Sequence, residues 1–214
     1  MGIKERKERE KLERRKLIQD AAKNLFQVKG FRFTTIEDIA AKAELSPGTL
    51  YQYFMSKESI YASLMLDATQ SMHDEIKKLY KNNNLSVERK MSMLQAAMYK
   101  AFENDPIGFQ GILHVLTENI IPVLSEELLG QVNRLIRDAM FMIAEIYQEG
   151  VRQGKFRREH TIAQVDIILG TFFGLIVWEE AKRKLNPKKQ FLKQTLGKAF
   201  EIYQRGIKID YNRQ

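Results

Sequence analysis

The chain of 214 residues contains no cysteine, which excludes disulfide bonds and thiolate metal sites and is typical of a reducing compartment. Histidine is nearly as scarce: His73, His114 and His160 have no metal-ligand spacing with one another or with carboxylates. The sequence also has no glycine-rich phosphate loop, no Ser-His-acid arrangement and no identifiable pair of catalytic carboxylates. We therefore predict a protein that is not an enzyme, has no catalytic residues and needs no metal or cofactor.

Long apolar segments are also missing. Uncharged runs reach only twelve residues, as from Ile167 to Trp178, whereas a helix that crosses a bilayer needs about 20 apolar residues. The N-terminal region is charged and no apolar segment follows its basic residues, so no signal peptide is predicted. We expect a cytoplasmic protein without a membrane partner, in which the Ile167–Trp178 run forms a buried helix.

Proline occurs only four times, each time near an expected helix start or joint, and alternation of period 2 with β-branched residues is absent. The sequence therefore predicts an all-α fold of about nine helices. A long first helix, two short helices and a fourth helix are expected over residues 4–29, 35–43, 46–54 and 56–80. Further helices are expected over residues 87–103, 107–119, 125–153, 162–184 and 187–209.

The net charge of +8 is unevenly distributed along the chain. Residues 1–57 hold 13 Lys and Arg against 8 Asp and Glu, a net of +5, and the other 157 residues hold 22 against 19, a net of +3. A basic excess at one end favours an anionic partner such as nucleic acid. The alternative is a lysine-rich surface that only contacts solvent.

Two short helices joined by a tight turn, with a longer helix beside them, make up a helix-turn-helix unit. Thr35 is the expected N-cap of the first short helix, with Asp38 three residues later to complete a capping box. Ser46 is the expected N-cap of the second, with Pro47 at the first helical position. Residues 35–54 are therefore predicted to bind DNA with the second short helix in the major groove.

The second short helix divides into inward and outward positions. Leu50 and Phe54 lie four residues apart and are expected to face the core. The outward side chains that can contact phosphates or base edges are Ser46, Thr49, Tyr51, Gln52, Tyr53 and Lys57. Among them, Gln52 has the bidentate geometry that suits adenine. The alternative is that these are ordinary surface residues of a helical hairpin.

The segment TTIEDIAAKAELSPGTLYQYFMSKESIY, residues 34–61, resembles the DNA-binding signature of the TetR (tetracycline-repressor-like) family of transcriptional regulators. The matching features are the Thr-Thr pair, Ile39-Ala40, Ser46, Gly48 to Tyr51, Tyr53-Phe54 and Ser56-Lys57-Glu58. The resemblance covers about residues 10–62. It implies a helix-turn-helix DNA-binding domain at residues 1–62 and an effector-binding and dimerisation domain at residues 63–214.

The resemblance also implies a set of DNA contacts. They are Thr35, Ser46, Pro47, Gly48, Thr49, Tyr51, Gln52, Tyr53 and Lys57. One position departs from the family pattern, because Glu44 stands in the turn where glycine is usual. A left-handed conformation costs about 1–2 kcal/mol at a residue other than glycine. The angle of the second short helix is the feature that this departure affects.

The carboxy-terminal segments LGTFFGLIVWEEAKRKL and FLKQTLGKAFEIYQRGI resemble the eighth and ninth helices of the family, which pair with those of a second subunit. The predicted dimer interface contains Gly170, Phe173, Gly174, Val177, Leu196, Phe200 and Tyr203. The sequence itself also favours this interface, since Gly170 and Gly174 lie four residues apart and permit close helix approach. The alternative is that both helices are covered within one chain.

The family holds a ligand cavity between its helix groups, and flexible methionines suit such a cavity. Residues on helices that can converge there are Met65, Met72, Met98, Phe102, Phe109, His114, Phe141 and Trp178. The alternative for each apolar member of this set is a place in the ordinary core.

Together the resemblance and the residues predict a homodimeric repressor of transcription that binds a near-palindromic double-stranded DNA operator. A small apolar or amphiphilic effector, which the sequence does not identify, is expected to release the repressor from this operator. One alternative is a helical interaction or membrane-surface protein with incidental DNA binding. Another is a DNA-binding member of the family that responds to no effector and recruits another protein.

Overall fold

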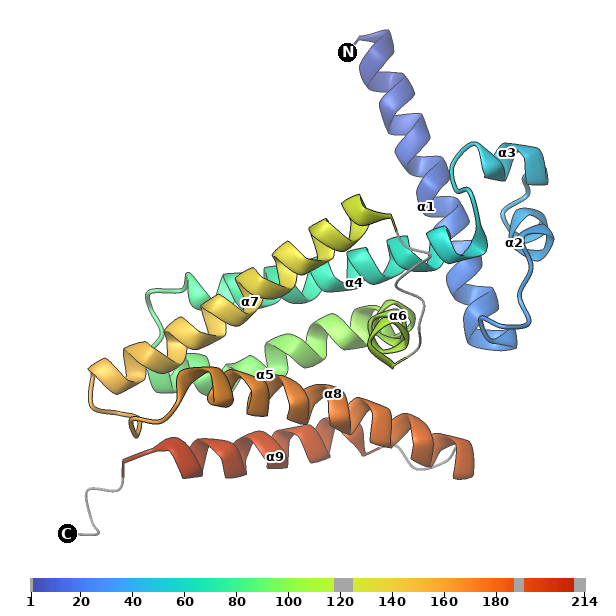
Figure 1. Cartoon of the computed structure of the whole chain (residues 1–214). Coiled ribbons are helices and arrows are strands. Elements are labelled where there is room, and N and C mark those ends of the chain that lie inside the picture. The colour runs from blue at the N-terminus through green and yellow to red at the C-terminus, as the bar shows by residue number, and fades with distance from the viewer. Residues whose placement is uncertain (1, 118–124, 187–190, 210–214) are drawn as a thin grey trace. The chain divides into compact units, whose positions relative to one another are not determined.

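The computed structural model describes residues 2–117, 125–186 and 191–209 (Figure 1). In these residues the chain is helical, with one isolated β-bridge between Phe156 and Lys208. The helices are α1 Ile3–Lys29, α2 Ile36–Lys42, α3 Pro47–Tyr51, α4 Lys57–Tyr80, α5 Val87–Asn104, α6 Pro106–Thr117, α7 Glu126–Arg152, α8 Thr161–Leu185 and α9 Leu192–Ile207. The predicted all-α fold with an amino-terminal helix-turn-helix is confirmed.

Contacts divide the chain into two compact units. The first consists of residues 1–69 and 105–131, and the second of residues 70–104 and 132–214. The helix-turn-helix, the start of α4 and all of α6 therefore belong to the first unit, and α5, α8 and α9 to the second. This division follows packing, so the functional boundary at residue 62 stays a prediction.

The short connections in the first unit are fixed by residues suited to helix ends. Helix α1 stops at Gly30, which has a φ of 80° and donates its N–H to the Phe26 carbonyl. Helix α2 starts with the predicted capping box: the Thr35 hydroxyl accepts from the Asp38 N–H, and the Asp38 carboxylate accepts from the Thr35 N–H. Such caps stabilise a helix by about 1 kcal/mol each.

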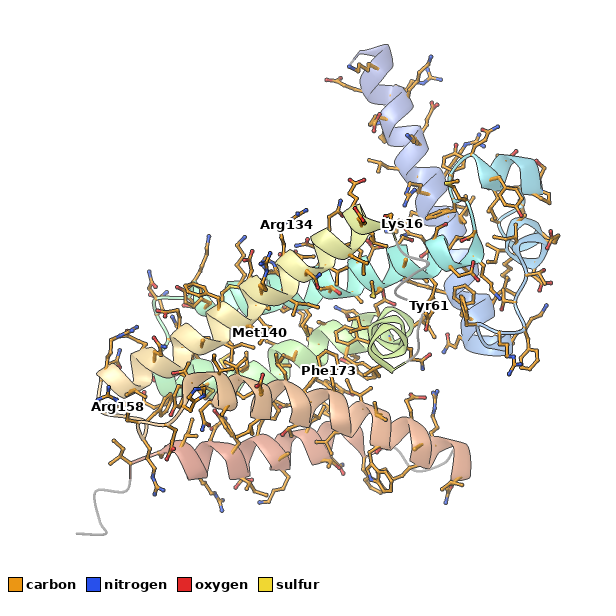
Figure 2. The ribbon with its side chains drawn as sticks, viewed as in Figure 1. Lys16, Tyr61, Arg134, Met140, Arg158 and Phe173 are labelled. Carbon is orange, nitrogen blue, oxygen red and sulfur yellow. The ribbon has the colours of Figure 1, made fainter. Side chains whose placement is uncertain are left out.

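The core of the first unit joins the helix-turn-helix to α1, α4 and α6. Its most deeply buried members are Ile18, Ala22, Ile39, Ala40, Leu50, Ile60 and Leu64. Beside them Tyr61 of α4 points toward α1, where its ring lies 5.5 Å from Phe26 and 4.6 Å from Phe31, centroid to centroid (Figure 2). Removing a buried Leu or Ile side chain from such a core costs about 2–5 kcal/mol.

Helix α6 crosses α4 at very short range within the first unit. A Cβ at Gly108 would lie 2.7 Å from the Ala68 Cβ and from the Leu64 carbonyl oxygen, so only glycine fits there. Asp105 begins this helix, because its carboxylate accepts from the Gly108 N–H at 3.0 Å and from Lys23 Nζ of α1 at 2.7 Å. These contacts tie the position of α6 to both α1 and α4.

In the second unit, α9 packs against both α8 and α5. The turn between α7 and α8 closes around Tyr147, whose hydroxyl donates to the Arg157 carbonyl at 2.6 Å and accepts from the Glu159 N–H at 3.1 Å. The buried Phe156 ring occupies the space over Gly150, where a Cβ would lie 2.0 Å from a ring carbon. The glycine at residue 150 is thus required by packing.

Candidate nucleic-acid interface

Helix α3 has only five residues, and its start is set by two local features. Ser46 is the N-cap: its Oγ accepts from the Thr49 N–H at 3.1 Å. Pro47 follows at the first helical position, where a missing N–H has no cost. The Ser46 and Thr49 hydroxyls also bond to each other at 2.9 Å, which uses one of their two hydroxyl hydrogens and leaves the other for an external acceptor.

The faces of α3 are divided as the sequence indicates. Leu50 is fully buried and Phe54 is 3% exposed, so both face the core as predicted. Tyr51 is 51% exposed, and Gln52 is also exposed. Tyr53 is half-buried and packs against the core, which leaves it less of its ring for an external contact than Tyr51 has.

Gly48 lies in the first turn of α3, is exposed, and has a negative φ that any residue adopts. A Cβ added at this position would meet only the Ser46 Oγ, at 3.9 Å, which is ordinary contact. Glycine in a helix is less favourable than alanine by about 1 kcal/mol. Neither the backbone nor the packing of the described residues therefore explains the glycine.

The turn between α2 and α3 contains a left-handed residue. Glu44 has a φ of 56° and is the one residue other than glycine with a positive φ in the described ranges. Glu44 thus takes the left-handed conformation at the turn position where the family usually has glycine. The Leu45 N–H then donates to the Ala40 carbonyl at 2.9 Å, which closes the turn in spite of the strain.

Lys57 has an internal role that the sequence did not indicate. Its Nζ donates to the carbonyls of Phe31 and Thr34 at 2.8 and 2.9 Å, and lies 4.5 Å from the centroid of the Phe31 ring. The ammonium group of lysine has three N–H donors, so one is left for a phosphate. Lys57 thus fastens the connection between α1 and α2 to the start of α4, and its predicted DNA contact stays a prediction.

Arg15 is a second positioning residue that sequence reasoning missed. Its Nη1 donates to the Tyr53 carbonyl at 3.0 Å, and its guanidinium carbon lies 4.1 Å from the centroid of the Phe54 ring. An arginine stacked on an aromatic ring contributes about 0.5–1 kcal/mol at a partly exposed site. Helix α1 is therefore held against the C-terminal end of α3.

Thr35 lies at the start of α2, with its side chain exposed. Its capping partner Asp38 has a lowered pKa, chiefly because of the hydrogen bond from Lys29 at 3.0 Å and then because of the Thr35 N–H. A carboxyl with a lowered pKa stabilises the fold above its unfolded pKa of about 3.9, and this contribution is lost as pH falls through the folded pKa. The N-cap of α2 is thus intact at neutral pH.

The residues predicted for the dimer interface fall into two groups. Leu196 and Phe200 are buried within the single chain. Gly170, Gly174 and Val177 are exposed along α8, while Phe173, which Figure 2 labels on α8, and Tyr203 are half-buried. The expectation that the Ile167–Trp178 run forms a buried helix holds for only one face, because Ile167, Val177 and Trp178 are about half exposed or more.

Helix α8 is also apolar enough over Thr161–Arg183 to cross a membrane by length and composition, with a mean hydropathy of 1.7. Only 22% of the 18-residue window that gives this value is buried inside the chain. Helices at subunit interfaces and core helices meet the same criterion, so this property identifies an uncovered apolar face and does not say what covers it.

The predicted effector-pocket residues are dispersed. Met65, Met72, Met98 and Phe109 are buried, Phe102 is half-buried, and Phe141 and Trp178 are each 61% exposed. The side chain of His114 lies outside the described residues. None of the other seven side chains lines either of the two cavities described next.

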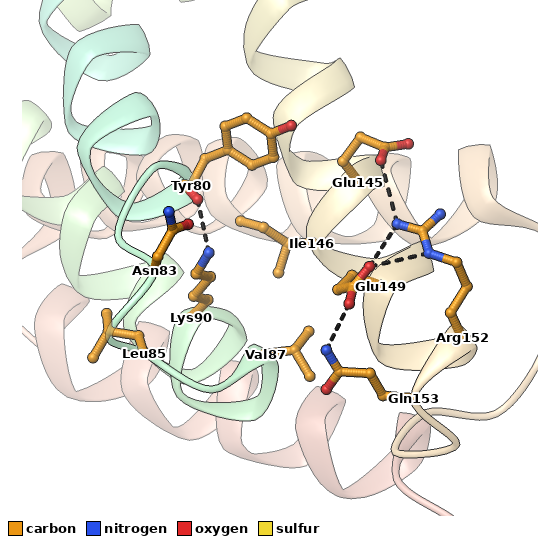
Figure 3. Close-up of a pocket in the computed structure, with 10 residues that line it drawn as sticks. All are labelled: Tyr80, Asn83, Leu85, Val87, Lys90, Glu145, Ile146, Glu149, Arg152 and Gln153. Atoms are coloured by element: carbon orange, nitrogen blue, oxygen red, sulfur yellow. Dashed lines mark hydrogen bonds and ion pairs between the residues drawn. The ribbon is translucent and has the colours of Figure 1, made fainter.

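One described cavity, of about 300 Å³, lies between the end of α4, the start of α5 and the end of α7 (Figure 3). Its cationic groups have partners in the lining: Lys90 donates to the Tyr80 carbonyl at 2.8 Å, and Arg152 donates to the Glu149 carboxylate at 2.8 Å. A larger hollow of about 600 Å³ adjoins Tyr147 and Phe156. Among the described residues, no three His, Asp or Glu side chains lie close enough to hold a metal ion.

Residues 18–64 match the family model of bacterial regulatory proteins of the tetR family. The chain carries the helix-turn-helix domain of the TetR family. It is 32% identical over 92 residues to the HTH-type transcriptional regulator YdgC of Bacillus subtilis, covering 43% of this chain and 47% of YdgC. The match to the regulator YerO of the same organism covers 49% of YerO, so the chain spans about half the length of both.

Solved structures share the fold over almost the whole chain. The TetR-family regulator PfmR from Thermus thermophilus has a TM-score of 0.73 at 23% identity, covering 88% of this chain and 97% of PfmR. The regulator FadR from Bacillus subtilis in complex with stearoyl-CoA has a TM-score of 0.69 at 20% identity, covering 89% of this chain and 98% of FadR. At these identities the likeness establishes the TetR fold alone.

The strained turn generates a prediction. Glu44→Gly should raise the free energy of unfolding by about 1 kcal/mol, and the melting temperature by about 2–4 °C, because glycine adopts a positive φ without steric cost. Glu37→Gly is the matched control, since Glu37 is an exposed glutamate inside α2, and it should lower the melting temperature. Thermal unfolding followed by circular dichroism measures both. A lower melting temperature for Glu44→Gly would contradict the assigned turn geometry.

Proposed function

We propose that this protein is a homodimeric regulator of transcription that represses its target genes by binding a near-palindromic operator. The observation that carries the proposal is the reading surface of α3, which we define as Pro47, Gly48, Tyr51 and Gln52: these exposed residues stand over the buried Leu50 and Phe54 in a domain of the TetR family. A helix held in this way can enter the major groove with its N-terminal residues toward the bases. The related KstR2 of Rhodococcus jostii is a transcriptional repressor, which supports the direction of regulation.

The glycine at residue 48 supports a close approach by DNA. Since a Cβ would fit there without a clash inside the chain, the position is free of internal constraint. Glycine is typical of positions where a backbone approaches a ligand closely. A phosphate or base edge beside the first turn of α3 would explain the glycine at residue 48, which neither the backbone conformation nor the packing of the chain requires.

Binding to DNA from the region flanking its own gene tests this function. Fluorescence anisotropy should show saturable, salt-sensitive binding that survives an excess of unrelated duplex. Absence of any preferred DNA, together with binding to anionic vesicles, would support the membrane-surface alternative and overturn the proposal.

Gly48→Ala separates a DNA-contacting role from a structural one. The substitution should leave the melting temperature unchanged or raise it, because alanine is the better helix former and meets no clash. It should nevertheless weaken operator binding at least about tenfold, equivalent to about 1.4 kcal/mol, because the new methyl group separates α3 from the duplex. Anisotropy titration and thermal unfolding on the same preparation give both values. Unchanged operator affinity would show that DNA does not approach α3 at residue 48.

The dimer is proposed to form through the outer face of α8. Ala163, Ile167, Gly170, Gly174, Val177 and Ala181 recur at helical spacing and are exposed. A Cβ at Gly170 or Gly174 would meet nothing within 4 Å in the single chain, which leaves room for a second helix. On α9, Tyr203 is half-buried, but its hydroxyl is buried inside the single chain and is out of reach of a second copy. A second copy would cover the exposed apolar face of α8.

Gly174→Arg tests the dimer without disturbing the chain itself. The side chain has open space in the single chain, so its helical content should stay unchanged, whereas a long cation at a close helix crossing should shift the protein from dimer to monomer. Asn133→Arg, at an exposed position of α7, is the control with the same new side chain. Sedimentation velocity distinguishes the two species. A Gly174→Arg protein that remains as dimeric as the control would place the interface elsewhere.

The effector is proposed to be a small apolar or amphiphilic molecule, and a long-chain acyl-CoA is the first candidate. FadR of Bacillus subtilis, which shares the fold, was solved in complex with stearoyl-CoA. Buried methionines of the second unit, such as Met72 and Met98, supply adaptable apolar surface of the kind that an acyl chain contacts. Release requires that the effector bind the DNA-free conformation better than the DNA-bound one, since equal affinity shifts nothing.

Stearoyl-CoA below its micellar concentration should raise the apparent Kd for operator DNA at least about tenfold, while coenzyme A without the acyl chain should leave it unchanged. The measurement is anisotropy of a labelled operator at fixed protein concentration. An unchanged Kd in both titrations would exclude acyl-CoA as the effector and would leave the proposed DNA binding intact.

A further inference from the structure

The amino-terminal half of α1 is a helical arm without a core of its own. We define the arm as residues 3–17, which precede Ile18, the first buried residue of the helix. Figure 1 shows this half of α1 extending past α2 and α3. Ion pairs one turn apart support its helix, from Arg6 to Glu10 at 2.9 Å and from Arg9 to Glu13 at 3.7 Å. Packing therefore does not explain why the chain continues the helix beyond the domain.

The basic residues of the arm are sorted by face. Lys4, Lys7, Lys11 and Arg14 follow a spacing of three, four and three residues, which places them on one side of a helix. We call these four residues the arm stripe. The four glutamates of the arm lie about 80° or more from the centre of the stripe around the helix, at the 100° per residue of an α-helix. One face of the arm therefore carries only positive charges, whereas the rest of its surface carries charges of both signs.

The cations of the stripe are also free of internal partners. Among the described residues, no ion pair or side-chain hydrogen bond joins Lys4, Lys7, Lys11 or Arg14 to another group, whereas Arg6 and Arg9 pair with glutamates. All four are exposed. The stripe is therefore available to an anionic partner, and the other basic residues are partly neutralised.

The stripe is continuous with the helix-turn-helix. Ile18 follows Arg14 by four residues on the same side of α1 and is fully buried in the core beneath α2 and α3. Arg15 fixes the helix at this junction through its 3.0 Å hydrogen bond to the Tyr53 carbonyl and its contact with the Phe54 ring. The stripe consequently leaves the domain beside the C-terminal end of α3, on the side of α1 that faces the helix-turn-helix.

We propose that the arm stripe binds the sugar-phosphate backbone of duplex DNA next to the segment that α3 reads. The inference rests on the proposed DNA binding and adds a second contact surface outside the residues that match the family model. Lys4 to Arg14 span about 15 Å of helix at 1.5 Å per residue. Duplex DNA presents about one phosphate charge per 1.7 Å of its axis, so several phosphates lie within reach. Lysine and arginine at these contacts add affinity without sequence preference.

An anionic membrane is the other partner that a basic helix can fit, and the arm is less suited to it. Helices that lie on membranes combine basic residues with a continuous apolar face. Among the described side chains of the arm, the exposed apolar ones are Leu12 and Leu17, which point about 140° apart around the helix. These described side chains form no continuous apolar face that could insert into a lipid surface, which favours DNA.

A charge-matched pair of variants of the full chain tests the arm stripe. The stripe variant carries Lys7→Gln, Lys11→Gln and Arg14→Gln, and the control carries Arg6→Gln, Arg9→Gln and Lys16→Gln. At 100° per residue, Lys16 lies about 160° around the helix from the centre of the stripe. Each removes three positive charges from the same helix, and glutamine preserves helix propensity. The control also removes the ion pairs of Arg6 and Arg9, so circular dichroism of both variants must first establish that the arm stays helical.

The measurement is the Kd for operator and for random duplex at several salt concentrations. The stripe variant should lose at least tenfold in affinity for both duplexes, and its slope of log K against log salt should become shallower by about 2–3 per chain. Its preference for operator over random DNA should stay unchanged, and the control should lose less than about threefold.

Three outcomes would overturn the inference. The stripe variant could keep the DNA affinity of the unmodified chain, or the stripe variant and the control could lose DNA affinity equally. The stripe variant could also keep its DNA affinity and lose only its binding to vesicles of phosphatidylserine and phosphatidylcholine. In each of these cases the unmodified chain still binds operator DNA through α3. Failure of the unmodified chain to bind any DNA would instead be the failure of the proposed function.

Discussion

The burial of Leu50 and Phe54 is the interaction on which the reading surface depends. Helix α3 has five residues, far fewer than a helix needs for stability in water by itself, so it exists only because its inner face is packed. Loss of either side chain would cost about 2–5 kcal/mol in the core. The same contact sets the direction of Tyr51 and Gln52. The position and the exposure of the residues of the reading surface therefore follow from the burial of Leu50 and Phe54.

Around these anchors, contacts from distant parts of the chain restrict how α3 can move. Arg15 ties α1 to the end of α3, and Lys57 ties the connection after α1 to the start of α4. In the same compact unit, the close crossing at Gly108 and the Lys23–Asp105 ion pair couple α6 to α4 and α1. A displacement of α4 or α6 therefore has a physical route to α3, which is the property a ligand-controlled DNA-binding protein needs.

Much of the fold follows from local chemistry in the sequence. The helix starts at Thr35, Ser46 and Ser56 and the stop at Gly30 all lie where the side chains indicate. Helix ends away from such caps are placed within about two residues, apart from the end of α3, expected at residue 54 and found at residue 51, and the start of α9, which is expected at residue 187. Residues 187–190 lie outside the described part of the chain, and the helix begins at residue 192. The expected end of α6 at residue 119 lies outside the described residues.

Positions that depend on packing partners far away in sequence were harder to predict. Periodicity identifies apolar faces but does not say which neighbour covers them: Leu196 and Phe200 are buried within the chain, while Val177 and Trp178 are not. Lys57 looks like a phosphate ligand by type, yet two of its donors bind carbonyls that only the folded turn brings near.

Amide hydrogen exchange with and without operator duplex tests the central claim most directly, because it locates the bound surface along the chain. The account predicts slower exchange in peptides that cover residues 44–57 and no change in α5, which belongs to the other compact unit. Tight DNA binding with unchanged exchange over residues 44–57 would contradict the assignment of α3 as the DNA-reading helix.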